Sequence, residues 1–128
     1  MNSESLFLDA SVLISILDED TFLEKIVSEL EKFENYYISP FSYLFGYEKC
    51  RKNGKHILEI HQLLEFYEIV KVDSQTFVKA KHISSDSDFE DSLQVASCIE
   101  NGITNLLTTN KKLASRYKKL LNIILLEK

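Results

Sequence analysis

The stretch Leu6-Phe7-Leu8-Asp9-Ala10-Ser11-Val12-Leu13 gives the first indication of how this chain folds. Its three apolar residues, Leu6 to Leu8, are typical of a short buried strand, and that strand ends at Asp9. Nearly all residues from Val12 to Leu17 are apolar, so a helix formed there would be apolar on almost every face, as expected of a buried helix. The stretch therefore predicts a buried strand that leads directly into a buried helix.

The same alternation continues along the rest of the chain. Further strands are expected at residues 36–38, 69–72, 103–108 and 123–126. Helical spacing or helix-start signals predict helices at 21–33, 41–51, 57–67 and 89–100, and from about 75 and 110 onward. Strands that alternate with helices indicate a parallel sheet covered on both faces. We therefore predict an α/β fold, a single three-layer domain over residues 1–128 with a mostly parallel, about five-stranded central sheet flanked by helices.

Composition excludes several other classes of protein. Only three Gly and one Pro occur in 128 residues, which disfavours a hairpin-rich all-β fold. The hydrophobic share of 45% is enough for a packed core and argues against disorder. Cys50 and Cys98 form no CxxC pattern, so neither a disulfide framework nor a thiolate zinc site is indicated. No signal peptide and no apolar run long enough for a membrane span is present, so a cytoplasmic protein without membrane contact is expected.

Polar residues follow two of the predicted strands, and acids gather before one helix. Asp9 ends the first strand, and residues 108–110, Thr-Thr-Asn, end the fourth. The acids before and within the first turn of the 89–100 helix are Asp86, Asp88, Glu90 and Asp91. Because ligands of open parallel sheets bind at the carboxyl ends of the strands, these side chains are expected to meet there. Carboxylates that meet repel one another and call for a cation, and oxygen ligands favour Mg²⁺ or Mn²⁺ over zinc.

Helix capping is the plain alternative for some of these residues. Asp88 and Asn110 each precede a predicted helix, where either residue type stabilises the free backbone N–H groups. For Asp88, capping is the favoured interpretation. Asp9 also precedes a helix, but an acid between an apolar strand and an apolar helix favours a functional role.

Two acid-free segments carry much of the positive charge. Residues 49–56 and 111–119 hold nine of the 15 Lys and Arg residues, although the chain as a whole has a net charge of −5. Basic segments beside an acidic pocket suit a phosphodiester substrate, with solvated helix ends as the alternative. The candidate residues for contacts with such a substrate are Lys49, Arg51, Lys52, Lys111, Lys112 and Arg116.

Four segments in this order, residues 6–13, 38–40, 88–94 and 101–113, resemble the PIN-domain family, the PilT N-terminus-like nucleases that include the VapC toxins. The resemblance implies a metal-dependent endoribonuclease that hydrolyses RNA phosphodiester bonds with Mg²⁺ or Mn²⁺. It also implies RNA as the substrate, an antitoxin or other protein partner for a toxin-like protein, and a homodimer.

The resemblance also assigns roles to individual residues. Asp9 matches the first metal-binding acid and Asp91 the acid at the helix start, with Asp88 as an accessory. Ser11 and Thr108 match supporting positions. Asn110 stands where the family often has a fourth acid, and its amide oxygen is expected to coordinate the metal without adding charge.

The second acid of the family pattern is missing, because Phe45 stands at its position. Glu48, three residues further along the same helix, is the expected catalytic substitute. With Phe45 and Asn110 both departing from the pattern, the alternative is a catalytically degenerate PIN fold that binds RNA or a protein partner without cleavage. Another α/β phosphotransfer fold is the weaker third option. A dehalogenase-like phosphatase would need a second Asp at position 11, where this chain has Ser11.

Overall fold

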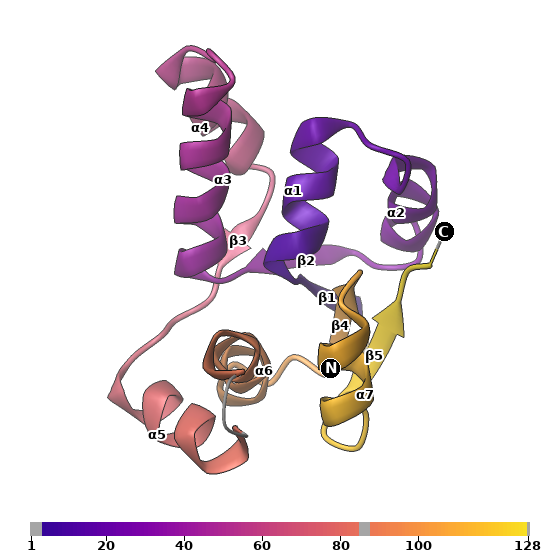
Figure 1. Ribbon diagram of the computed structural model, residues 1–128, viewed down its shortest axis with the longest axis vertical. Coiled ribbons are helices and arrows are strands. Elements are labelled where there is room, and N and C mark those ends of the chain that lie inside the picture. Colours follow the sequence, from indigo (N-terminus) through magenta and orange to yellow (C-terminus); the bar gives the residue numbers. More distant parts are fainter. Residues whose placement is uncertain (1–3, 85–87, 128) are drawn as a thin grey trace.

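The computed structural model describes residues 4–84 and 88–127 and has a central sheet between two layers of helices (Figure 1). The strands are β1 (Ser5–Leu8), β2 (Asn35–Ile38), β3 (Glu68–Ile69), β4 (Asn105–Thr108) and β5 (Asn122–Leu125). The helices are α1 (Ala10–Asp18), α2 (Leu23–Leu30), α3 (Pro40–Lys52), α4 (Ile57–Leu64), α5 (Ser74–Ile83), α6 (Phe89–Glu100) and α7 (Lys111–Tyr117).

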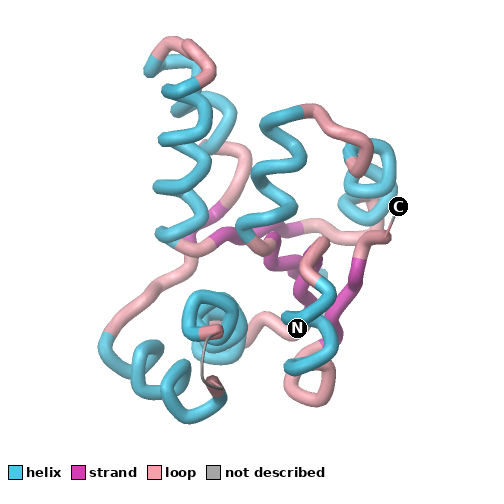
Figure 2. Tube along the Cα trace, in the orientation of Figure 1, coloured by secondary structure: helices cyan, strands magenta, loops and turns pink. Residues whose placement is uncertain are grey.

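The sheet is fully parallel, and its strand order is β3-β2-β1-β4-β5. The first strand is thus central, with β2 on one side and β4 on the other. Figure 2 shows the strands as a narrow layer with helices on either side. The predicted three-layer α/β fold with five mostly parallel strands is confirmed, and every strand pair is parallel.

Alternation along β1 explains why both faces of the sheet are covered. Leu6 and Leu8 are fully buried in a core cluster formed with the helices α1 to α4. Phe7 points to the opposite face and is fully buried in a second cluster with α6 and α7. The helices α1 to α4 lie on one side of the sheet in Figure 1, and α5 to α7 lie on the other. A strand with apolar residues on both faces needs helices on both sides of the sheet to cover it.

Local signals set several of the helix ends. The Ser39 hydroxyl accepts the Ser42 N–H at 3.0 Å and caps α3, with Pro40 in the first turn. Asp73 begins α5 with a capping box that includes Thr76. After α6, Gly102 adopts a φ of 69°, a conformation that glycine tolerates at a helix end.

The third strand is shorter than expected, since it covers Glu68–Ile69 and not residues 69–72. Val70 still donates its N–H to the Ile38 carbonyl at 3.0 Å. The Asn101 side chain then bonds both backbone groups of Lys71, accepting its N–H at 3.2 Å and donating to its carbonyl at 2.9 Å. This long-range side-chain contact takes the place of further strand pairing.

No helix in the ranges 4–84 and 88–127 has the length and apolar character to cross a lipid bilayer.

Candidate functional site

The site lies at the carboxyl end of the two central strands. Asp9 directly follows β1, and Asn110 begins α7 two residues after the end of β4. Helix α6 starts at the same edge, because Asp91 in its first turn contacts Asn110. The order of strands changes direction between β1 and β4, and such a position is where open α/β sheets bind ligands.

Asp9 is held at the centre of this edge by two hydroxyl groups. The residue is 5% exposed, and its Oδ2 accepts hydrogen bonds from Ser11 Oγ and Thr108 Oγ1, both at 2.8 Å. Although Asp9 precedes α1, its carboxylate makes no capping hydrogen bond to that helix. The capping alternative therefore does not account for the acid at this position.

The two hydroxyl groups also fix the loop that follows β4. Ser11 Oγ accepts the Thr109 N–H at 3.2 Å, and Thr108 Oγ1 accepts the Asn110 N–H at 3.0 Å. Each hydroxyl thus accepts from the backbone and donates its own proton to Asp9. This arrangement couples the position of the Asp9 carboxylate to the start of α7.

Asp91 faces the same region from α6, and its surroundings disfavour its negative charge. Partial burial raises the pKa of Asp91 above its ordinary range, and the neighbouring charges of Asp9 and Asp88 raise this pKa further. The hydrogen bond from Asn110 and the charge of Arg116 act in the opposite direction. A cation between Asp9 and Asp91 would relieve this repulsion.

Asn110 presents its nitrogen, and not its oxygen, to the acid. Its Nδ2 donates to the Asp91 oxygens Oδ1 and Oδ2 at 3.3 and 3.4 Å. Its Oδ1 accepts the N–H groups of Lys112 and Leu113 at 3.0 and 3.2 Å and so caps α7. This geometry differs from the expected role of the amide oxygen as a metal ligand, because that oxygen is already engaged in capping.

A cavity of about 300 Å³ opens beside these residues. Its polar wall includes Asp9, Ser11, Asp91 and Asn110. Its other lining residues are Ala10, Phe41, Phe45, Glu90, Leu93 and Gln94. The polar residues come from α1, α6 and the start of α7, so the sheet brings together side chains that are about a hundred positions apart in the sequence.

Glu48 is not brought to this cavity, in contrast to the expectation that it replaces the missing second acid. Among the described residues, the α3 side chains that line the cavity are Phe41 and Phe45. The Glu48 carboxylate instead pairs with Arg51 at 2.9 Å, and this contact lowers the pKa of Glu48. Position 48 lies about 4.5 Å further along α3 than position 45 and roughly 60° away in direction, so Glu48 does not take the place of Phe45 at the cavity wall.

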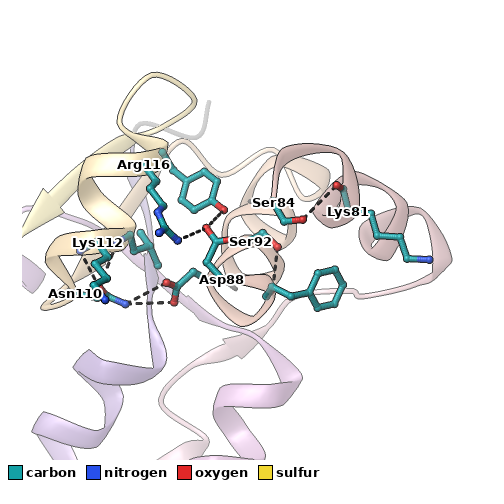
Figure 3. A network of polar contacts seen from close by, with 11 residues as sticks. Lys81, Ser84, Asp88, Ser92, Asn110, Lys112 and Arg116 are labelled. Carbon is teal, nitrogen blue, oxygen red and sulfur yellow. Dashed lines mark hydrogen bonds and ion pairs between the residues drawn. The ribbon is translucent and has the colours of Figure 1, made fainter. Parts of the chain in front are cut away.

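Asp88 forms a buried contact with α7 and does not cap α6, so the capping interpretation is wrong for this residue. Its carboxylate is paired with Arg116 at 3.0 Å and accepts a hydrogen bond from the Tyr117 hydroxyl. Figure 3 shows the Arg116 side chain reaching Asp88 across the gap between α7 and α6. The acid thus ties α6 to α7 beside the cavity. Asp86 was grouped with these acids in the sequence and lies outside the described residues.

The candidate RNA-binding residues divide into two groups. On α3, Lys49 pairs with Asp18 at 3.5 Å and Arg51 pairs with Glu48. Lys52 lies in the same last turn, roughly 16 Å along the helix from Phe41 at the cavity. On α7, Lys111 and Lys112 are exposed, directly follow Asn110, and make no ion pair within the described part of the chain.

The donors at the cavity suit a hydrated divalent cation. Residues 4–84 and 88–127 contain no group of three or more His, Cys, Asp or Glu side chains arranged to hold a metal. Mg²⁺, however, keeps several of its waters and commonly binds through only one or two carboxylates. Asp9 and Asp91 supply such a pair, and the raised pKa of Asp91 marks a place where positive charge is favourable.

Sequence reasoning missed Gln94, which lines the cavity and is 6% exposed. The available signal was its spacing of three residues after Asp91, which places both on one face of α6. Phe41 was missed in the same way, four residues before Phe45 on α3.

Comparison with known proteins gives one family match and several similar structures. The family model described as PIN domain matches residues 6–119. No curated protein sequence matches the chain. A chain of a toxin–antitoxin complex from Klebsiella pneumoniae superimposes with a TM-score of 0.74 at 12% identity, covering 93% of this chain and 95% of that one.

Two further solved structures have the same fold. A chain of VapBC2 from Rickettsia felis, bound to a DNA fragment from its promoter, has a TM-score of 0.63 at 16% identity and covers 95% of this chain and 97% of that one. A chain of VapBC-1 from nontypeable Haemophilus influenzae has a TM-score of 0.65 at 16% identity, with coverage of 94% and 97%.

Proposed function

The chain belongs to the PIN-domain family, and on that basis we propose that it is a metal-dependent endoribonuclease that hydrolyses RNA phosphodiester bonds with Mg²⁺ or Mn²⁺. One observation carries the proposal most directly. Asp9 and Asp91 line one cavity, and their mutual repulsion contributes to the raised pKa of Asp91. Two carboxylates held in this way favour a bound cation.

Each residue at the cavity has a distinct task in this proposal. Asp9 and Asp91 would hold the cation. When bound, the cation would stabilise the negative charge of the phosphate and lower the pKa of a bound water. Ser11 and Thr108 hold the Asp9 carboxylate in place through their hydrogen bonds to Oδ2. Asn110 holds the Asp91 carboxylate through the hydrogen bond that its Nδ2 donates. The charge on the metal site is therefore supplied by two acids, with neutral groups fixing their geometry.

We propose that Lys111 and Lys112 hold the RNA backbone. They extend α7 from Asn110 at the cavity and are free of ion pairs with the described residues. The basic residues of α3 are assigned no such role, because Lys49 and Arg51 are paired with acids at the far end of that helix. Arg116 is engaged with Asp88, so its first role is to hold that acid.

The second candidate function is a PIN fold that binds RNA or a protein without cleaving it. The observation that favours it is Phe45, which occupies the cavity wall where the family pattern has an acid, while Glu48 pairs with Arg51 elsewhere. Fewer anionic ligands reduce the affinity for a divalent cation.

A protein partner is also proposed. The three similar structures described above come from toxin–antitoxin assemblies, so an antitoxin that covers the cavity would control a toxin-like nuclease. A homodimer is a further proposal, with the family resemblance as its support.

The test is cleavage of a structured RNA by the full chain in Mn²⁺, in Mg²⁺ and in EDTA. Metal-dependent cleavage that is lost in Asp9→Asn supports the nuclease. RNA binding without cleavage in any metal would establish the second function in its place. Equal cleavage by wild-type protein and Asp9→Asn would show that the activity does not come from this site.

A further inference from the structure

Gln94 carries a buried amide oxygen that lacks a hydrogen bond. The residue is 6% exposed, and its Nε2 donates to Ser42 Oγ at 3.0 Å. Its Oε1 is buried and has no partner among the residues that the structure describes. Burial of an acceptor without a donor is unfavourable, so such an atom indicates a partner that is not part of the protein chain.

The position of Gln94 indicates what that partner is. Gln94 lines the same cavity as Asp9 and Asp91 and follows Asp91 by nearly one helical turn. Its amide reaches α3 at Ser42, which lies three residues before Phe45. Gln94 therefore stands on the side of the cavity where the family pattern would place a second acid.

We propose that Gln94 Oε1 completes the site for a hydrated divalent cation, by accepting a hydrogen bond from one of the waters that the cation keeps. The inference rests on the proposed function, because it requires a cation between Asp9 and Asp91. Mg²⁺ and Mn²⁺ retain waters when few protein ligands are available, and each of these waters needs an acceptor.

In the metal-free protein, a neutral acceptor is less unfavourable at this cavity than a third acid would be. Asp9 and Asp91 already place two mutually repelling carboxylates at this cavity. An amide oxygen orients a water without adding to that repulsion in the metal-free protein. Gln94 thus compensates in part for the missing acid at position 45.

A purely structural role is the competing explanation, and Ser42 distinguishes the two. If Gln94 only joins α6 to α3, its effect passes through the hydrogen bond to Ser42 Oγ. Ser42→Ala removes that bond and leaves the Gln94 oxygen in place. Gln94→Leu removes both the bond and the oxygen at similar side-chain size.

The experiment measures Mn²⁺ binding to the full chain without RNA, by the electron paramagnetic resonance signal of free Mn²⁺. We expect Gln94→Leu to weaken binding about tenfold, the scale of effect when groups around metal ligands are removed. Ser42→Ala is expected to stay within about twofold of the wild type. Gln94→Glu keeps an acceptor oxygen and adds a negative charge once its carboxyl is ionised. We expect this variant to bind Mn²⁺ more tightly than the wild type, by a factor that grows as the pH rises.

Several results would overturn the inference. Unchanged affinity in Gln94→Leu would do so, as would an equal loss in Ser42→Ala. If Gln94→Leu does not fold in a thermal melt, Gln94→Glu decides, and unchanged Mn²⁺ affinity in that variant contradicts the proposal. Asp9→Asn distinguishes failure of the Gln94 proposal from failure of the proposed function. If Asp9→Asn abolishes Mn²⁺ binding and Gln94→Leu does not weaken it, only the role of Gln94 fails. If Asp9→Asn binds Mn²⁺ like the wild type, the proposed function fails with it.

Discussion

Asn110 donates its side-chain amide to both carboxylate oxygens of Asp91, at 3.3 and 3.4 Å, while its own oxygen caps α7. One residue thus fixes the acid on α6 and the start of the basic helix α7. Figure 3 shows this contact beside the Arg116–Asp88 pair, so two bridges link the same two helices. The bridge from Asn110 is neutral, and it lies next to a carboxylate whose pKa is raised.

The first prediction concerns Asp91→Asn in metal-free protein. The raised pKa means that the folded protein binds this proton more tightly than the unfolded chain does, so stability falls as pH rises from 3.8, the ordinary pKa, through the raised value. Asn at position 91 cannot ionise, so Asp91→Asn does not lose stability in this way as the pH rises. We expect it to have a higher unfolding temperature than the wild type at pH 7, with the difference shrinking toward pH 4.

The measurement is thermal unfolding in EDTA across this pH range, with Asp88→Asn as the matched control. Asp88 is paired with Arg116, so its loss should lower the unfolding temperature. A less stable Asp91→Asn at neutral pH would contradict the account of this site.

The second prediction concerns Asn110→Asp, which places a carboxylate where the family often has one. Aspartate caps helices about as well as asparagine, so α7 should keep its start. The added charge beside Asp91 should lower the metal-free unfolding temperature and raise Mn²⁺ affinity about tenfold, equivalent to about 1.4 kcal/mol. Calorimetric titration with Mn²⁺ checks this result, and weaker binding than in the wild type would count against a cation at Asp91.

The third prediction concerns the buried hydroxyl of Tyr117. This hydroxyl donates to the Asp88 carboxylate, and burial together with that contact raises the pKa of Tyr117. Tyr117→Phe should cost about 1.5–3 kcal/mol of unfolding free energy, the usual range for a hydrogen bond to a charged group.

Urea denaturation measures this loss, and Tyr67→Phe is the control. Burial alone raises the pKa of Tyr67 to about 12, and its hydroxyl makes no hydrogen bond with the described residues. Its removal should change stability little. Equal effects in the two variants would show that the Tyr117–Asp88 contact contributes nothing specific.

The fourth prediction concerns RNA binding by α7. The double variant Lys111→Gln, Lys112→Gln should bind RNA more weakly and reduce the slope of log affinity against log salt by about 1.4, the value for two lost contacts to single-stranded phosphates. Arg51→Gln should leave the slope unchanged, because Arg51 is paired with Glu48. Fluorescence anisotropy in EDTA, at several salt concentrations, tests both. A larger change in Arg51→Gln would assign RNA binding to α3.

The sequence predicted the fold well because apolar spacing and caps are local signals. The bounds of α6 at Phe89–Glu100 and of α3 at Pro40–Lys52 agree within one residue with the helices expected at 89–100 and 41–51. The predicted end of β3 was wrong. Beyond this strand the backbone of Lys71 is bound by the side chain of Asn101, which lies 30 positions away in the sequence. Contacts of this kind leave no local pattern in the sequence.

The candidate site was predictable only in part, for the same reason. Strand ends placed Asp9, Thr108 and Asn110 at one edge of the sheet, and the structure brings them together with Asp91. The capping interpretation of Asp88 failed because its partners, Arg116 and Tyr117, lie on another helix. Gln94 gave no motif, since its unpaired oxygen becomes visible only once α3 packs against α6.

The central claim is that Asp9 and Asp91 hold the cation on which RNA cleavage depends. Its most direct test compares the single-turnover cleavage rate in Mn²⁺ for wild-type protein, Asp9→Asn and Glu48→Gln. We predict a loss of about a hundredfold or more in Asp9→Asn, as when a central catalytic group is removed. Glu48→Gln should keep the wild-type rate, because Glu48 is paired with Arg51 and does not line the cavity. A rate that is unchanged in Asp9→Asn, or lost only in Glu48→Gln, would contradict the account.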